Sequence, residues 1–169
     1  MADERGAVTL RAATLDDEAA LGRLDQLTWS WLSSPAPSPT RPFFNGDSAE
    51  GVIVAELDGD VVGYVKLRPP TELASNAHVL AIHGLAVDPA VQGRGIGRRL
   101  LEAADDVAVA RGVRRLTLRV FGPNAAARRL YKKHGYVVEG VQRAEFRVPA
   151  GPDGALVDID DVMMAKTLV

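Results

Sequence analysis

The chain has no cysteine among its 169 residues. This absence excludes a disulfide framework, a cysteine-based zinc site and a covalent intermediate on a cysteine thiolate. Long apolar runs are also missing, because none approaches the roughly 20 residues that a membrane-spanning helix requires. Met1 to Arg5 lacks the basic-then-apolar layout of a signal peptide. We therefore expect a cytoplasmic protein that has no membrane partner and no bound metal.

The residues that are present are those of an ordinary globular protein, with 47% hydrophobic and 25% charged residues. This length suits a single domain over residues 1–169. The charge is uneven: residues 92–133 carry a net +8, and the remainder carries −10. The basic segment favours a polyanionic ligand, and the acidic remainder favours a cationic one. Aromatic residues are not interleaved with the arginines, so we expect no nucleic-acid partner.

Hydrophobic periodicity and turn residues predict an alternating series of strands and helices. Asp58-Gly59-Asp60 lies between two β-branched runs and predicts a hairpin. This order indicates an α/β fold with a single mixed, mostly antiparallel sheet, one central parallel strand pair, and helices on both faces. The expected strands are 8–12, 51–57, 61–67, 79–87, 115–121, 136–148 and 156–168, and the expected helices are 15–32, 95–111 and 124–134.

A proline-rich segment, 33–42, follows the first expected helix and predicts a surface loop. Trp29 and Trp31 stand just before this loop. Tryptophan is common both in cores and at recognition surfaces. The two residues are therefore candidates either for the core or for contact with a substrate.

Three glycines alternate with other residues between the 79–87 strand and the 95–111 helix, in Gln92-Gly93-Arg94-Gly95-Ile96-Gly97. The N–H groups at a helix start lack helical partners and favour a negative charge, which predicts a cradle for a diphosphate. A nucleotide P-loop requires Gly-Lys-Ser/Thr, whereas Arg98-Arg99 follows Gly97 here. A dinucleotide fingerprint requires its third glycine one residue later. A plain glycine-rich turn is the structural alternative.

The pattern Gln92-x-x-Gly95-x-Gly97 resembles the coenzyme A loop of the GNAT superfamily of N-acetyltransferases. The segment from Asn124 through Leu130-Tyr131 to Gly135-Tyr136 is similar to that family's Asn-x-x-Ala…Leu-Tyr…Gly-Phe/Tyr signature. The order of the expected elements also resembles the GNAT fold along nearly the whole chain.

The resemblance implies that acetyl-CoA is the cosubstrate and assigns roles to the matched positions. Backbone N–H groups would hold the pyrophosphate, strand backbone would pair with the pantetheine arm, and Asn124 would bond to that arm or simply cap its helix. The cofactor-binding positions are Leu85, Ala86, Val87, Gln92, Gly93, Arg94, Gly95, Ile96, Gly97, Arg98 and Asn124.

The resemblance also implies that Tyr131 donates a proton to the leaving thiolate. Many family members carry a glutamate base at the position of Ala81. We expect His83 to project on the same strand face as Ala81 and Leu85, and its ordinary pKa near 6.5 suits a base. The base remains open among His83, other ionisable side chains and an ordered water; those side chains are His78, Glu139 and Glu145.

The expected reaction is transfer of an acetyl group to a primary amine by direct attack in a ternary complex. The acidic remainder favours a small cationic amine, such as a polyamine or an aminoglycoside-like compound; a protein N-terminus or a lysine is the alternative. Trp29 and Trp31 are the candidate acceptor contacts. A non-catalytic acyl-CoA sensor is a second hypothesis, and the C-terminal hairpin is a candidate for homodimer contact.

Overall fold

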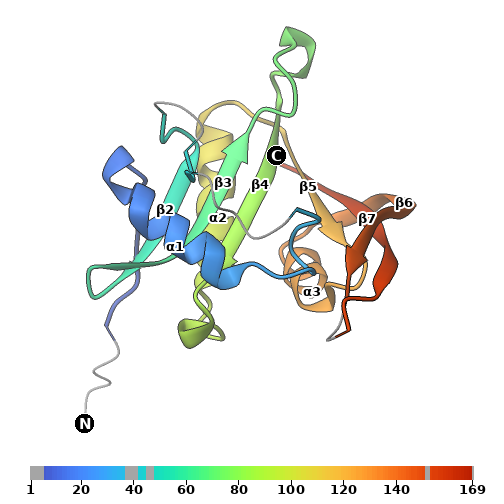
Figure 1. The fold of residues 1–169 in the computed structure, drawn as a ribbon. Helices are drawn as coiled ribbons and strands as arrows, with labels where there is room; N and C mark the ends of the chain where they lie inside the picture. Colours follow the sequence, from blue (N-terminus) through green and yellow to red (C-terminus); the bar gives the residue numbers. More distant parts are fainter. Residues whose placement is uncertain (1–5, 37–41, 45–47, 151–152, 169) are drawn as a thin grey trace.

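The computed structural model describes residues 6–36, 42–44, 48–150 and 153–168. Within them, seven strands form one sheet in the order β1-β2-β3-β4-β5-β7-β6 (Figure 1). The strands are β1 Thr9–Ala12, β2 Val52–Leu57, β3 Asp60–Arg68, β4 Val79–Val87, β5 Arg115–Phe121, β6 Val137–Pro149 and β7 Leu156–Thr167. The helices are α1 Glu18–Thr28, α2 Ile96–Ala110 and α3 Ala125–Lys133, with short 3-10 turns at Leu15–Asp17, Ala74–Asn76 and Pro89–Val91.

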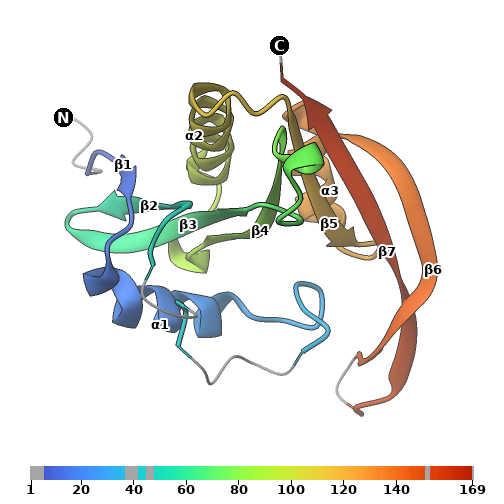
Figure 2. The same cartoon turned by 90° about the horizontal axis from the view of Figure 1, so that it is seen from above.

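The sheet is antiparallel except at β4 and β5, which run parallel and are bridged by α2. Helix α1 covers one face, and α2 and α3 cover the other (Figure 2). Leu21 and Leu24 of α1 pack on Tyr64, whereas Leu100 of α2 and Tyr131 of α3 belong to the opposite core. The expected α/β fold class is therefore confirmed.

The first helix is shorter than the sequence predicted, because α1 ends at Thr28 instead of near residue 32. The Ser30 N–H donates to Ser33 Oγ at 2.9 Å, and the Ser33 hydroxyl donates to the Ser30 carbonyl oxygen at 2.8 Å. Such local serine bonds compete with helical ones. Residues 37–41 of the expected proline-rich loop and 151–152 of the β6–β7 connection lie outside the described residues. In the described part of the chain, no helix is both long and apolar enough to cross a membrane.

Strand β4 contains a bulge at His83, because Lys66 pairs with Gly84 while Leu67 pairs with Ile82. The extra residue reverses the alternation of side chains. Ile82 before the bulge and Leu85 after it both contact the core under α2. The expectation that Ala81, His83 and Leu85 share one face is therefore wrong, since Ala81 and Leu85 point to opposite faces.

The parallel pairing of β4 with β5 is short: it runs from Val79–Arg115 to Ile82–Leu118 and then stops. Beyond this point β4 continues to Val87 and β5 to Phe121, but the two strands no longer pair with each other. From His83 onward, the edge of β4 that faces β5 therefore lacks a neighbouring strand. The two strands diverge here, at the centre of the sheet.

Candidate active site

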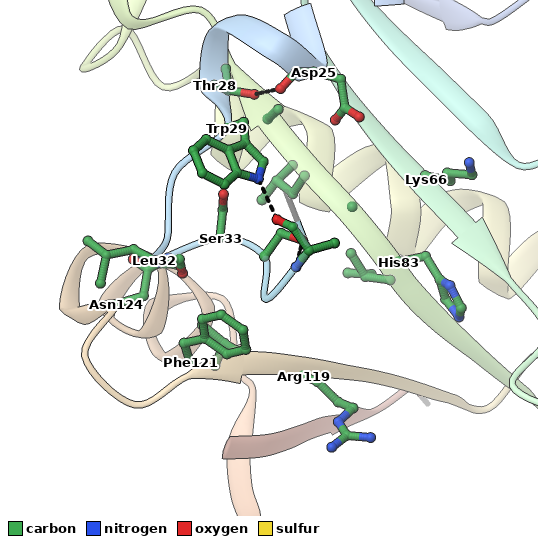
Figure 3. A pocket seen from close by; sticks show the side chains of 18 of the residues that line it. Asp25, Thr28, Trp29, Leu32, Ser33, Lys66, His83, Arg119, Phe121 and Asn124 are labelled. Carbon is green, nitrogen blue, oxygen red and sulfur yellow. Dashed lines mark hydrogen bonds between the residues drawn. The ribbon is translucent and has the colours of Figure 1, made fainter. Parts of the chain in front are cut away.

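A cavity of about 950 Å³ opens where β4 and β5 diverge. Residues of α1 and the turn after it, and of β3, α3, β6 and β7, also line it. Figure 3 shows Asp25 and Trp29 on the α1 side and Arg119 and Phe121 on the β5 side. Of the site residues that the sequence predicted, six line the cavity: Trp29, His83, Leu85, Ala86, Asn124 and Tyr131. Trp31, Val87 and the glycine loop lie outside this lining.

Two glycines of the glycine loop have left-handed backbone conformations. Gly93 and Gly95 have φ angles of 79° and 76°, a left-handed conformation that glycine adopts without strain. The first intrahelical bond of α2 runs from the Arg99 N–H to the Gly95 carbonyl oxygen at 3.1 Å. The N–H groups of Ile96 to Arg98 thus have no helical acceptor, and a Cβ added at Gly95 would meet open space. The loop can hold an anionic group.

Side chains around the loop fix its shape and add positive charge. The Gln92 side-chain amide donates to the Val87 carbonyl oxygen at 3.1 Å, which ties the loop to the end of β4. Arg99 donates to the Val8 carbonyl oxygen at 2.8 Å. Arg94 and Arg98 are exposed beside the start of α2, where Arg98 lies 3.6 Å from Glu102. Gln92 therefore fixes the position of the loop relative to β4, and Arg94 and Arg98 add exposed positive charge near the loop.

Tyr131 of α3 is 8% exposed and packs edge-on against Tyr136, with ring centroids 5.8 Å apart. Burial raises the pKa of the Tyr131 phenol to about 12. Its hydroxyl forms no hydrogen bond with the residues that the structure describes. At neutral pH this group is therefore a protonated donor in the wall of the cavity.

His83 occupies the bulge of β4 and lines the cavity near Lys66 of β3 (Figure 3). Partial burial, followed by the positive charges of Lys66 and Arg68, lowers the pKa of the His83 imidazole. The ring is therefore neutral at pH 7 and can accept a proton. The carboxylate of Glu139, another candidate base, is paired with Arg115, and this contact lowers its pKa.

Asn124 caps α3 and tethers the turn after α1. Its Oδ1 accepts from the Ala127 N–H at 3.1 Å, and its Nδ2 donates to the Leu32 carbonyl oxygen at 3.1 Å. This geometry agrees with the expected N-cap. Among the described residues, none accepts the second Nδ2 hydrogen, which leaves it available to a ligand.

The two tryptophans have different environments. Trp29 lies in the cavity wall, and its indole N–H donates to the Ala36 carbonyl oxygen at 3.0 Å (Figure 3). Trp31 packs instead against the small core of Phe121, Val148 and Ile159. The structure thus places Trp29, but not Trp31, in the lining of this cavity.

Four charged residues of the lining were not identified from the sequence. The Tyr64 hydroxyl donates to Asp25 Oδ1 at 2.6 Å, and Arg119 of β5 pairs with Asp161 of β7. These side chains come from four separate elements, so no spacing in the sequence relates them. The set of four consists of Asp25, Lys66, Arg119 and Asp161. Two carboxylates and two cations balance, so the acidic excess expected for the acceptor site is not concentrated in this lining.

Comparisons with known proteins give matches over much of the sequence. Residues 19–136 match the family model for the acetyltransferase (GNAT) family. A mycothiol acetyltransferase of Beutenbergia cavernae is 40% identical over 92 residues, which is 54% of this chain and 29% of that protein. The N-alpha-acetyltransferase RimI of Mycobacterium tuberculosis is 39% identical over 99 residues, 56% of each chain. The matches thus span less than two thirds of either relative.

Solved structures share the fold along nearly the whole chain. The yncA structure from Salmonella typhimurium, described as a putative acetyltransferase with its cofactor acetyl-CoA, has a TM-score of 0.74 and 22% identity, covering 96% of this chain and 95% of that one. The Escherichia coli ribosomal-protein-S18-alanine N-acetyltransferase has a TM-score of 0.69 and 24% identity, covering 96% and 94%. With the family model matching more than half of its residues, the chain belongs to the acetyltransferase (GNAT) family.

Proposed function

We propose that this protein transfers the acetyl group of acetyl-CoA to a primary amine by direct attack in a ternary complex. Acetyl-CoA is the cosubstrate of this family. The observation that carries the proposal is the unpaired edge of β4. It leads from the glycine loop to the cavity that holds His83 and Tyr131.

The described residues fit this cosubstrate. The N–H groups at the start of α2 would hold the pyrophosphate, and Arg94 and Arg98 would add positive charge. The backbone of Leu85 to Val87 would pair with the pantetheine arm as an added strand does. The remaining Nδ2 hydrogen of Asn124 would contribute one bond to that arm.

The side chains of His83 and Tyr131 would then accept a proton and donate a hydrogen bond during the reaction. Bound acetyl-CoA supplies the activated acyl group, and β4 N–H groups near the bulge would polarise its carbonyl. His83 would take a proton from the acceptor ammonium, so that the neutral amine can attack the thioester carbon. The pKa of Tyr131, about 12, exceeds the ordinary thiol value near 8.5. Tyr131 would therefore stabilise the departing thiolate mainly as a hydrogen-bond donor.

We propose a small amine as the acceptor and a peptide N-terminus as the alternative. The mycothiol acetyltransferase supports the first, and RimI, named an N-alpha-acetyltransferase, supports the second. We also propose that residues 1–169 act as one cytoplasmic domain. Contact between two copies through the β6–β7 hairpin remains a prediction.

The direct test is acetyl-CoA-dependent thiol release with polyamines, aminoglycosides, amino acids and short peptides. Release with one class of amine, strongly reduced in Tyr131→Phe, is the expected result. Acetyl-CoA binding without release from any amine would instead indicate a sensor of acyl-CoA.

A further inference from the structure

Asp161 is a buried carboxylate in the cavity wall formed by β5 and β7. It is 2% exposed and lies opposite Phe121 in the sheet register. Arg119 donates to its Oδ2. Its Oδ1 is buried and accepts no hydrogen bond from the described residues. Leaving a buried oxygen of a charged group without a donor is costly, so Oδ1 is a position that a ligand donor would satisfy.

The surroundings of Asp161 restrict what that donor can be. Phe121, its partner in the register, packs against Phe146 with ring centroids 5.4 Å apart, and both rings line the cavity. Arg119 is held in place because it also donates to Gln142 and lies 3.9 Å from Glu145. Arg119 is thus the counter-ion of the buried Asp161 carboxylate, whereas the Glu145 carboxylate is exposed to solvent. A second cation would lose its hydration beside Arg119, whereas a neutral N–H or O–H would not face that penalty.

The topology separates Asp161 from the proposed point of attack. That point lies between β4 and β5, whereas Asp161 stands on β7, which pairs with the other edge of β5. Neighbouring strands are about 4.8 Å apart. A ligand group at Asp161 is therefore several bonds away from the attacking nitrogen.

We propose that Asp161, held by Arg119, determines acceptor specificity by accepting a hydrogen bond from a neutral hydroxyl or amide N–H that the acceptor carries several bonds from its reacting amine. This inference rests on the proposed amine acetylation and narrows it. Hydroxylated amines, such as amino sugars, and peptide amines carry this donor. Simple polyamines place a second ammonium there.

The first test compares amines of matched size in the wild-type protein. The set is 4-amino-1-butanol, n-pentylamine and 1,4-diaminobutane, with β-alaninamide as the amide arm. We expect kcat/KM for the amino alcohol or the amide to exceed that of both other amines by about 10-fold, as expected for a hydrogen bond to a charged group. Preference for the alcohol or for the amide then identifies whether Asp161 accepts its hydrogen bond from a hydroxyl or from an amide N–H.

The second test is Asp161→Asn, in which the amide oxygen can face Arg119 and an N–H then faces the cavity. We expect the preference for donor-bearing amines to disappear, with KM for acetyl-CoA changed less than 2-fold. Asp158→Asn is the matched control, because Asp158 is an exposed residue of the same strand and pairs with Arg147. Thermal melting by circular dichroism checks that both variants fold. If Asp161→Asn does not fold, the wild-type amine set decides.

Two results would overturn the inference. The first is a wild-type protein that acetylates amines but has equal kcat/KM for the matched amines, or a higher kcat/KM for the diamine. Asp161 would then not select a neutral donor. The second is a folded Asp161→Asn protein that keeps the preference for donor-bearing amines, because Asp161 would then not be the source of that preference. Failure of the proposed function has a different signature, since no amine would then release thiol from the wild type, and the inference would fall with it.

Discussion

The candidate active site, taken as the cavity together with the glycine loop beside it, has two walls of different composition. The backbone wall, residues 83–98, is one continuous stretch that offers mainly N–H and C=O groups from the β4 edge and the α2 start. The side-chain wall combines α1, β3, β5 and β7, and presents Asp25, Lys66, Arg119 and Asp161. A backbone wall depends on conformation and suits one constant ligand. A side-chain wall changes with single substitutions and suits a variable one.

The largest expected effect comes from disrupting the backbone wall at Gly95. Gly95→Asp introduces a carboxylate where an anion is proposed to bind, and we expect acetyl-CoA affinity to fall about 100-fold or more by calorimetry. Gly112→Asp is the matched control. Gly112 follows the other end of α2, has φ of 71° and also faces open space. If both variants lost the same affinity for acetyl-CoA, backbone strain would explain the loss, and the glycine loop would not be the anion site.

Tyr131→Phe removes the proposed donor at the junction of the two walls. We expect kcat to fall about 100-fold, the loss typical of removing one hydrogen-bond donor to a developing negative charge, while acetyl-CoA affinity stays within about 2-fold. Tyr136→Phe provides the comparison, because the Tyr136 hydroxyl is buried without a hydrogen-bond partner in the described residues and Tyr136 is not among the lining residues. Similar kinetics for both variants would make Tyr131 a packing residue.

His83→Gln tests the bulge of the backbone wall, with an expected loss of about 10-fold in kcat/KM. The neutral imidazole is the active form, and its pKa is lowered from 6.5. Wild-type activity should therefore be present at pH 7 and decline as the pH falls below 6.5, whereas the variant should lack this decline. His78→Gln, at an exposed position, should keep the wild-type pH profile. An unchanged acidic limb in His83→Gln would assign the base elsewhere.

The smallest expected effects distinguish the two tryptophans. Trp29→Ala should raise KM for the acceptor about 3-fold, because it removes an aromatic surface from the cavity wall. Trp31→Ala should instead lower the melting temperature by several degrees, because Trp31 packs on the Phe121 core. If Trp31→Ala raised KM for the acceptor and Trp29→Ala lowered the melting temperature, Trp31 would be the residue that contacts the substrate.

Most of the backbone wall could be predicted from the sequence, because its strands, turns and helix start depend on residues that are neighbours along the chain. The 79–87 and 115–121 strands have the expected bounds, and the Asp58-Gly59 turn has φ angles of 53° and 90°, as its hairpin signal requires. Glycine conformation and helix starts depend on neighbours along the chain, so the loop at 92–97 could be identified. The bulge at His83 could not, because it depends on the register between β3 and β4.

The side-chain wall was largely beyond prediction. Arg119 and Asp161 are 42 residues apart and meet only because β5 pairs with β7. In the sequence, Asp161 is one of several acids near the C-terminus, and nothing in its spacing distinguishes it. The family resemblance covered the cofactor loop and Tyr131. It carried no information about which side chains would face the acceptor.

The central claim is that the two walls hold two substrates at the same time. Initial rates measured while acetyl-CoA and the preferred amine are both varied test it most directly. Double-reciprocal plots that intersect are the predicted result, because attack occurs within a ternary complex. Parallel lines would contradict the account, since they require an acetylated enzyme intermediate and release of coenzyme A before the amine binds.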